Sequence, residues 1–394
     1  MATEVKSRIA KRMQGVHGEA AFETLARANE LERQGRSIIH LEIGEPDFDT
    51  PSAIVNSAID WLKKGATHYP PSPGVVELRQ AIAKHLSATR NVNIDPACVV
   101  VSPGAKMMIF TIINCLVDPG DEVIYPAPAY PAYEAAIKMA GGVGVPVTLE
   151  EAREFRFDLA EVERRITPRT KMIITNSPQN PTGGVLTLDD LKGLGDLARK
   201  HDLFIMSDEI YAEICYGETP ASMLDVPNLT DRLIFIHGFS KTYAMTGWRL
   251  GYSVVPKDIY PTVALYINNT VSSTATFTQR AAVEAFSAQT AEDVAKMVAE
   301  FRKRRDVFVD GLNSIPGIHC LRPHGAFYLF PNISALGHSS KEVADRLLME
   351  GGVSALPGTA FGVQGEGYLR FSFANSLPNI EQALERIRKF VTTL

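Results

Sequence analysis

The alternation of short apolar runs with segments of helical spacing is the feature that most constrains the fold of this chain. β-branched runs at 99–101 and 123–125 each precede a stretch with helical spacing, at 107–116 and 133–140. The pattern recurs later, with apolar runs at 171–175, 203–206 and 233–236 and a helical stretch at 188–200. Near-continuous apolar runs separated by helices are typical of strands buried on both faces of a mostly parallel sheet. The sequence therefore predicts an α/β protein.

We predict two domains in these 394 residues, since that length is two to three times the usual domain unit. Residues 50–285 carry the sheet and form the large domain. After residue 286, long helical segments alternate with short strand candidates at 326–330 and 368–374, which indicates a smaller α+β domain. A helix predicted at 22–34 packs beside it, so the small domain combines residues 1–49 and 286–394.

Composition excludes several classes of protein. With 45% hydrophobic and 22% charged residues, the chain is neither disordered nor fibrous. A net charge of −5 lacks the basic excess of a nucleic-acid binder, so no nucleic-acid partner is expected. The four cysteines lie far apart without a C-x-x-C pair, which predicts no metal site and no disulfide framework and favours the cytoplasm. Residues 1–15 lack the apolar core of a signal peptide, and no run of 18 apolar residues predicts a membrane span.

Polar segments follow four of the predicted strands. They are Ser102–Lys106, Asn176–Gly183, Ser207–Tyr211 and His237–Lys241. Because the carboxyl ends of parallel strands lie on one edge of a sheet, and ligands bind in the crevice there, these four segments are predicted to converge on one site.

One part of this site is suited to a phosphate group. Gly104, Ala105 and Lys106 form a turn that opens a predicted helix, and such a turn can offer free backbone N–H groups to an anion. Arg249 can add a planar guanidinium to the same anion. A phosphorylated ligand is therefore predicted.

Two further residues indicate which phosphorylated ligand. Asp208 directly follows a buried strand, where a carboxylate needs a cationic partner such as a protonated pyridine nitrogen. Lys241 lies at the same edge, where burial and nearby cations lower the pKa of a lysine toward that of a nucleophilic amine. Lysine, carboxylate and phosphate cradle together predict a pyridoxal 5′-phosphate (PLP) site.

Taken alone, each of these residues also has an ordinary structural role. Asp208 by itself is more typical of a helix N-cap, and the segment 180–183 of a simple turn. Arg249 and Arg370 are also typical of surface ion pairs. Lys106 is equally consistent with a phosphate loop and with a residue that contacts substrate. It is the shared placement of these residues that favours the functional interpretation.

Several short motifs are spread over nearly the whole chain: GEPDF at 44–48, NPTG at 180–183, SK at 240–241, GWRLG at 247–251, GAFY at 325–328 and LRFS at 369–372. Together they resemble the class I and II aminotransferases of the fold-type I PLP enzymes. This resemblance implies a large domain with a seven-stranded, mostly parallel sheet flanked by helices, and a smaller α+β domain.

The resemblance also implies roles at the cofactor. Lys241 forms the Schiff base with PLP and then moves the proton, while Asp208 holds the pyridinium nitrogen. Asn180 and Tyr211 resemble the pair that hydrogen-bonds the phenolic oxygen of the cofactor. Tyr130 matches the aromatic residue that stacks on the ring.

Further roles concern the substrate and a second subunit. Arg370 matches the arginine that grips the α-carboxylate, Gly44 lies where backbone lines the substrate pocket, and Lys106 resembles a lysine that contacts the side-chain carboxylate of aspartate. Ser240, beside the lysine, belongs to the cofactor-binding motif. Tyr69 resembles a tyrosine that reaches the phosphate of a neighbouring subunit, which implies a homodimer with shared active sites.

The predicted activity is the transfer of an amino group from an L-amino acid to a 2-oxo acid by a ping-pong mechanism, with a preference for aspartate or glutamate. One departure from the family is Gly238, where a hydroxyl residue often contacts the phosphate. A C–S or β-lyase, a cyclising eliminase or an amino-acid oxidase remains an alternative, because small pocket differences redirect the chemistry of the same cofactor. A ligand-sensing regulator is disfavoured, since no basic helix-turn-helix pattern precedes the aminotransferase-like part.

Overall fold

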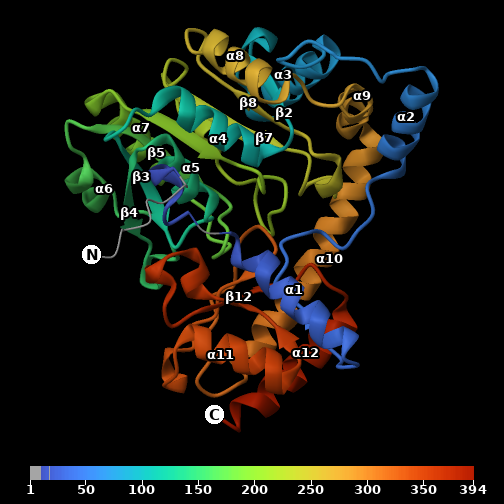
Figure 1. Ribbon diagram of the computed structural model, residues 1–394, viewed down its shortest axis with the longest axis vertical. Coiled ribbons are helices and arrows are strands. Elements are labelled where there is room, and N and C mark those ends of the chain that lie inside the picture. The colour runs from blue at the N-terminus through green and yellow to red at the C-terminus, as the bar shows by residue number, and fades with distance from the viewer. Residues whose placement is uncertain (1–9, 17) are drawn as a thin grey trace, which may run out of the picture.

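A seven-stranded sheet forms the centre of the upper half of the molecule as drawn in Figure 1. The computed structural model describes residues 10–16 and 18–394. The strand order is β2-β8-β7-β6-β5-β3-β4, and only β8 (Gly251–Val254) runs antiparallel to its neighbours. The predicted α/β class with a mostly parallel, seven-stranded sheet is therefore confirmed.

The five apolar runs of the sequence form five of these strands. They are β2 (Val99–Ser102), β3 (Glu122–Ala127), β5 (Thr170–Asn176), β6 (Phe204–Asp208) and β7 (Leu233–Gly238). Every residue of β2, β3 and β7 is buried, because helices cover both faces of the sheet. Full burial of one valine or isoleucine side chain stabilises a fold by about 1.5–3 kcal/mol, which explains why these runs carry almost no polar residues before their carboxyl ends.

The edge strand β4 (Val143–Thr148) was not predicted from the sequence. It pairs on one side only, with β3, and Val143 is 48% exposed. An edge strand tolerates residues such as Gly144 and Pro146, which an interior strand does not. The run therefore lacks the apolar pattern that marked the other strands.

The helices of this part are α2 (Ser52–Lys63), α3 (Val76–Arg90), α4 (Ala105–Leu116), α5 (Ala132–Ala140), α6 (Leu159–Arg165), α7 (Leu188–His201), α8 (Tyr260–Val271) and α9 (Thr276–Ala281). The start of α7 shows how the sequence sets such boundaries. Thr187 and Asp190 form a capping box, in which each side chain accepts a hydrogen bond from the backbone of the other. The helix ends where Asp202 adopts a left-handed conformation.

Segments from both ends of the chain meet in the lower half of Figure 1. Strand β1 (Ile39–His40) pairs with β10 (Val353–Ser354), and β11 (Leu356–Pro357), β12 (Leu369–Ser372) and β9 (Tyr328–Leu329) form a second small sheet. The helices here are α1 (Ala20–Arg33), α10 (Ala288–Asn313), α11 (Ser340–Arg346) and α12 (Leu377–Val391). Ile39 and Leu41 share a buried cluster with Phe301, Phe371 and Phe390, so residues far apart in sequence form one core.

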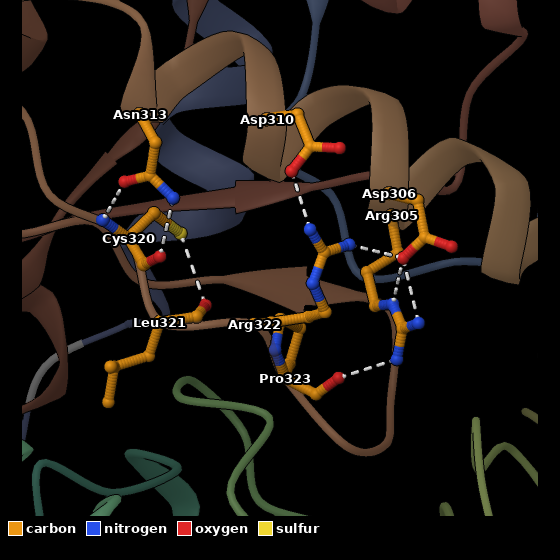
Figure 2. A network of polar contacts seen from close by, with 8 residues as sticks. All are labelled: Arg305, Asp306, Asp310, Asn313, Cys320, Leu321, Arg322 and Pro323. Carbon is orange, nitrogen blue, oxygen red and sulfur yellow. Dashed lines mark hydrogen bonds and ion pairs between the residues drawn. The ribbon is translucent and has the colours of Figure 1, made fainter.

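Polar contacts fix the segment before the GAFY motif to α10, as Figure 2 shows. Arg322 donates hydrogen bonds to the carboxylates of Asp306 and Asp310, one helical turn apart on α10. Arg305, also on α10, donates to the carbonyl of Pro323 at 3.0 Å. These contacts fix residues 322–323 on α10, directly before residues 325–328, which reach the site described below.

The described residues also bear on the membrane prediction. None of their helices has the length and apolarity needed to cross a bilayer. The prediction of no signal peptide falls largely on residues 1–9, which lie outside the described residues.

Candidate active site

A pocket of about 550 Å³ lies at the carboxyl edge of the large sheet. Asn176 and Asp208, the last residues of β5 and β6, are register partners there, and the segment after β7 adds Lys241. Tyr328 and Arg370 from the smaller sheet line the opposite wall. Most residues predicted for the site line this pocket: Gly44, Ala105, Lys106, Tyr130, Asn180, Asp208, Tyr211, Ser240, Lys241, Arg249 and Arg370.

Lys241 is partly buried, and its Nζ donates a hydrogen bond to the carbonyl of Gly44 at 2.6 Å. Burial lowers the pKa of Lys241 to about 8, and the charges of Arg370 and Arg249 act in the same direction, while Glu45 opposes them. The ammonium has no carboxylate partner in the part of the chain that the structure describes. About a tenth of Lys241 is therefore the neutral, nucleophilic amine at pH 7, far more than for a lysine with an ordinary pKa.

Asp208 is 3% exposed and faces the pocket. The Tyr133 hydroxyl donates to its Oδ2 at 2.7 Å, and the Ile210 N–H donates to its Oδ1 at 3.3 Å. Burial raises the pKa of Asp208, while these two hydrogen bonds act to lower it. A carboxylate this deeply buried is stabilised by a cation placed against it, and the pocket provides the space for one.

Arg370, in β12, is buried and forms no ion pair with a carboxylate of the described chain. It donates hydrogen bonds to the Glu42 carbonyl and, at 3.4 Å, to Asn180 Oδ1, whereas its Nε has no partner there. Its guanidinium lies 4.6 Å from the ring centre of Tyr328 and 5.1 Å from that of Phe361. Burial lowers the pKa of Arg370. A buried guanidinium with spare donors is suited to bind a carboxylate in bidentate fashion.

The start of α4 and Arg249 form an anion cradle. Gly104 precedes the helix with a φ of +91°, and a Cβ atom there would meet the guanidinium of Arg249. A Cβ atom at Gly251 would clash with the backbone nitrogen of Ala105. Two glycines thus let the first N–H groups of α4 and Arg249 approach each other, where they can bind a phosphate together.

Four tyrosines line the pocket and make contact in two pairs. The hydroxyl groups of Tyr211 and Tyr328 lie 2.7 Å apart, and burial raises the pKa of Tyr211 well above its usual value. The ring of Tyr130 packs edge-on against Tyr133, with ring centres 5.8 Å apart. A Cβ atom at Gly44 would clash with the Tyr328 hydroxyl, so glycine is needed at this wall.

Lys106 lies in the same pocket, and its ammonium pairs with the carboxylate of Glu19. Glu19 also accepts a hydrogen bond from the Tyr130 hydroxyl at 3.1 Å. The residue predicted to contact a substrate carboxylate thus holds a carboxylate of its own chain.

Two predicted residues lie beside or away from the pocket in the single chain. Gly104 does not line it but directly precedes Ala105, which does. Tyr69 is 89% exposed and lies at a separate hollow with Trp61 and Arg280. In one protomer Tyr69 therefore does not reach this pocket.

Sequence reasoning did not select several residues that line the pocket, among them four with polar side chains that matter here: Glu19, Tyr133, Asn176 and Tyr328. Signals existed for three of them. Asn176 opens one of the four polar segments, Tyr328 ends the GAFY motif, and Tyr133 comes one helical turn after Tyr130. Glu19 carried no signal, because it precedes the predicted helix and lies 87 residues from Lys106.

The pocket combines three groups that few cofactors can satisfy together: a buried carboxylate, an amine and an anion site. Asp208 is buried where a cation such as a protonated ring nitrogen would offset its desolvation, Lys241 offers an amine, and the start of α4 offers an anion site. PLP contains a basic pyridine nitrogen, an aldehyde and a phosphate. The residues present thus fit PLP, and fold and site together define a PLP-dependent enzyme.

Comparison with known proteins specifies the family. Residues 36–387 match the family aminotransferase class I and II, and the chain belongs to that family. It is 38% identical to an aspartate aminotransferase of Geobacillus stearothermophilus, over 98% of this chain and 99% of the relative. It is 39% identical to a probable aspartate/prephenate aminotransferase of Aquifex aeolicus, over 97% and 98%.

Solved structures agree with this assignment. The structure of the Thermus thermophilus aspartate aminotransferase with maleate has a TM-score of 0.93 to this chain at 36% identity, covering 98% of this chain and 100% of that one. The protein is thus a PLP-dependent aminotransferase. The predicted resemblance, enzyme class and cofactor are confirmed.

Proposed function

We propose that this aminotransferase uses acidic L-amino acids, aspartate or glutamate, as amino donors and passes the amino group to a 2-oxo acid. The observation that carries the proposal is a second cation, Lys106, in the same pocket as Arg370. Two cations match the two carboxylates of a dicarboxylic amino acid. The names of the relatives support this choice, and so does the Thermus enzyme, whose structure was solved with maleate, itself a dicarboxylate.

Lys241 is assigned the proton transfer. When bound, PLP supplies an aldehyde that takes up the amino group and a ring that stabilises negative charge at the substrate α-carbon. Lys241 would hold the cofactor through its amine, and this amine would be free to act as a base when an amino acid occupies the cofactor in its place. Because burial lowers the pKa of Lys241 to about 8, its amine would be able to accept the proton from Cα and to donate it again within the pocket.

The other residues hold the reactants in place. Arg370 binds the α-carboxylate and thereby sets the direction of the Cα–H bond, so orientation supplies much of the rate. Asp208 keeps the pyridine nitrogen protonated, and Tyr133 positions Asp208 by a hydrogen bond of 2.7 Å. Asn180 and Tyr211 are assigned to the phenolic oxygen.

The remaining predicted residues complete the cofactor site. Tyr130 would stack on the ring of the bound cofactor, and Ser240 lies beside the lysine in sequence. Gly104, Ala105 and Arg249 bind the phosphate, and Gly44 supplies the carbonyl that Lys241 contacts. With Gly238 in place of a hydroxyl residue, the phosphate depends more on Arg249 and the start of α4.

A homodimer with shared active sites is part of the proposal. Tyr69 is 89% exposed in the single chain, an unusual state for an aromatic side chain with Trp61 and Arg280 around it. Reaching the phosphate of a second protomer would give this side chain a function. Light scattering of the purified protein tests the dimer, and a weaker PLP affinity of Tyr69→Phe tests the shared site.

The two-domain division and the location are proposed on similar grounds. Residues 50–285 contain the whole seven-stranded sheet, while Ile39 shares a core with Phe301 and Phe371, which supports a small domain of residues 1–49 and 286–394. Limited proteolysis tests the boundary. The four cysteines are free thiols, which supports the cytoplasm, and cell fractionation tests it.

The visible spectrum of the purified holoenzyme tests the activity. Aspartate, glutamate, phenylalanine and alanine are added in turn without a 2-oxo acid. We expect the acidic pair to bleach the band of the bound cofactor at the lowest concentrations and to yield a 2-oxo acid. Release of ammonia with an unchanged band would instead identify an eliminase or oxidase, and bleaching by neutral amino acids alone would overturn the acidic substrate class.

A further inference from the structure

The carboxylate of Glu19 occupies the part of the pocket that is assigned to the substrate side chain. It accepts hydrogen bonds from the Lys106 ammonium and, at 3.1 Å, from the Tyr130 hydroxyl. Lys106 lies 5.7 Å from the ring centre of Tyr130, so the two donors form one compact site. An ammonium and a hydroxyl side by side are what a protein would use to bind the side-chain carboxylate of a substrate.

A dicarboxylic substrate and Glu19 would therefore meet at the same ammonium. Two carboxylates within hydrogen-bonding reach of one cation repel each other, more strongly where water is partly excluded. A substrate carboxylate can pair with Lys106 only if Glu19 moves away. A neutral substrate side chain has no such requirement, and finds Lys106 already neutralised by Glu19.

We propose that Glu19 is an internal competitor for Lys106 and thereby sets the preference of the pocket between dicarboxylic and neutral amino acids. This inference rests on the proposed function, because it concerns the same substrate pocket. Glu19 is a specificity residue here, since it acts through Lys106 and leaves the reacting atoms untouched.

The local structure lets Glu19 move. It precedes α1 with extended backbone (φ −73°, ψ 121°), and its side chain forms no capping hydrogen bond with the helix. The side chains of Glu19 and Lys106 are 23% and 41% exposed. Ion pairs with this much solvent contact are weak, so a substrate can displace Glu19 at a modest cost in affinity.

The test compares wild-type holoenzyme with Glu19→Gln, which removes the charge but keeps the shape of the side chain. Maleate binding is titrated through the cofactor band, and kcat/KM is measured with aspartate and with phenylalanine. We expect Glu19→Gln to bind maleate up to about fivefold more tightly, the scale of one partly exposed ion pair. The ratio of kcat/KM for aspartate to that for phenylalanine should rise by a similar factor, partly through weaker use of phenylalanine beside an unpaired Lys106.

Two further variants make the result specific. Glu23→Gln removes the same charge four residues further on, from an exposed position in the first turn of α1 outside the pocket, and should leave both readouts unchanged. Glu19→Gln combined with Lys106→Met completes a double-mutant cycle. In that background the effect of Glu19→Gln should disappear, because the residue that Glu19 competes for is gone.

The inference is overturned if Glu19→Gln changes neither maleate affinity nor the substrate ratio, or if its effect persists in the Lys106→Met background. A wild-type enzyme that uses phenylalanine but no acidic amino acid would refute the proposed substrate class alone. Glu19→Gln would still decide the inference in that case: newly gained maleate binding supports it, and continued rejection of maleate overturns it.

Discussion

The two cations of the pocket stand in opposite situations. Arg370 is buried, packs against the rings of Tyr328 and Phe361 and has no carboxylate partner in the described chain. Lys106 is 41% exposed and already holds the carboxylate of Glu19. Arg370 is thus buried and open to an anion, whereas Lys106 is partly exposed and already paired with a carboxylate.

This difference separates two requirements of an aminotransferase. Every amino acid has an α-carboxylate, so its binding site can be rigid and its desolvation cost is offset each time a substrate binds. The side chains of amino-acid substrates differ, so the part of the pocket that contacts them must accept side chains of different size and charge. A solvent-exposed ion pair tolerates this, because breaking it costs little.

The largest effect is expected from replacing Lys241, which serves the part of the reaction that is the same for every amino acid, as Arg370 does. Lys241→Ala removes the amine that moves the Cα proton, so we expect kcat to fall by about 10⁴-fold or more. The loss should be the same for aspartate and phenylalanine, because the proton is common to both. Stopped-flow measurement of the first half-reaction gives the rate for each substrate.

Lys257→Ala is the matched control for this loss, since Lys257 is exposed and lies outside the pocket. The Lys241→Ala protein should still contain PLP, held by the other contacts of the site. Full activity in Lys241→Ala would refute the assignment of the proton transfer.

Arg370→Lys probes the buried cation. A lysine keeps the charge but loses the planar pair of donors, and truncating one side of a buried ion pair typically costs about 2–5 kcal/mol. We therefore expect kcat/KM to fall at least about thirtyfold, equally for aspartate and phenylalanine. Arg346→Lys, which changes an arginine paired with Glu350 far from the pocket, should have no effect. A loss confined to aspartate would mean that Arg370 binds the side chain instead.

The same contrast explains what could be predicted from the sequence. The strands β5, β6 and β7 were predictable because burial on both faces leaves only apolar residues, and the polar residues at their ends then had to share one edge. That geometry places Asp208 and Lys241 together without any knowledge of the loops. Their roles came from the resemblance to a family.

Glu19 could not be predicted in this way. Its contact with Lys106 joins a segment ahead of α1 to the first turn of α4, and no periodicity connects the two. The edge strand β4 was not predicted for a related reason: most of its residues are only partly buried, so they show no apolar pattern. Sequence patterns report burial, so features at the solvent boundary are the ones that need the structure.

The pH dependence of PLP uptake tests whether burial lowers the pKa of Lys241. With a pKa of about 8, lowered by burial, the neutral amine makes up about a tenth of Lys241 at pH 7 and about nine tenths at pH 9. Because only the neutral amine attacks an aldehyde, the rate at which apoprotein takes up PLP should rise about ninefold over this range and then level off. A rate that keeps rising beyond pH 10 would show an ordinary, solvated lysine. Lys241→Ala lacks the amine, so its rate of PLP uptake should not show this rise between pH 7 and pH 9.

Lys106→Met should give the smallest change in kcat/KM, and it tests most directly the difference between Lys106 and Arg370. Losing one partly exposed cation should lower kcat/KM for aspartate about fivefold, while kcat/KM for phenylalanine stays nearly unchanged. Lys138→Met is the control, since Lys138 is similarly exposed and paired with Glu134 at 2.7 Å outside the pocket. An equal loss for both substrates would place Lys106 with the phosphate cradle at the start of α4. A loss for aspartate alone would mean that the exposed cation contacts only the variable part of the substrate, and that the buried Arg370 serves the part that all amino acids share.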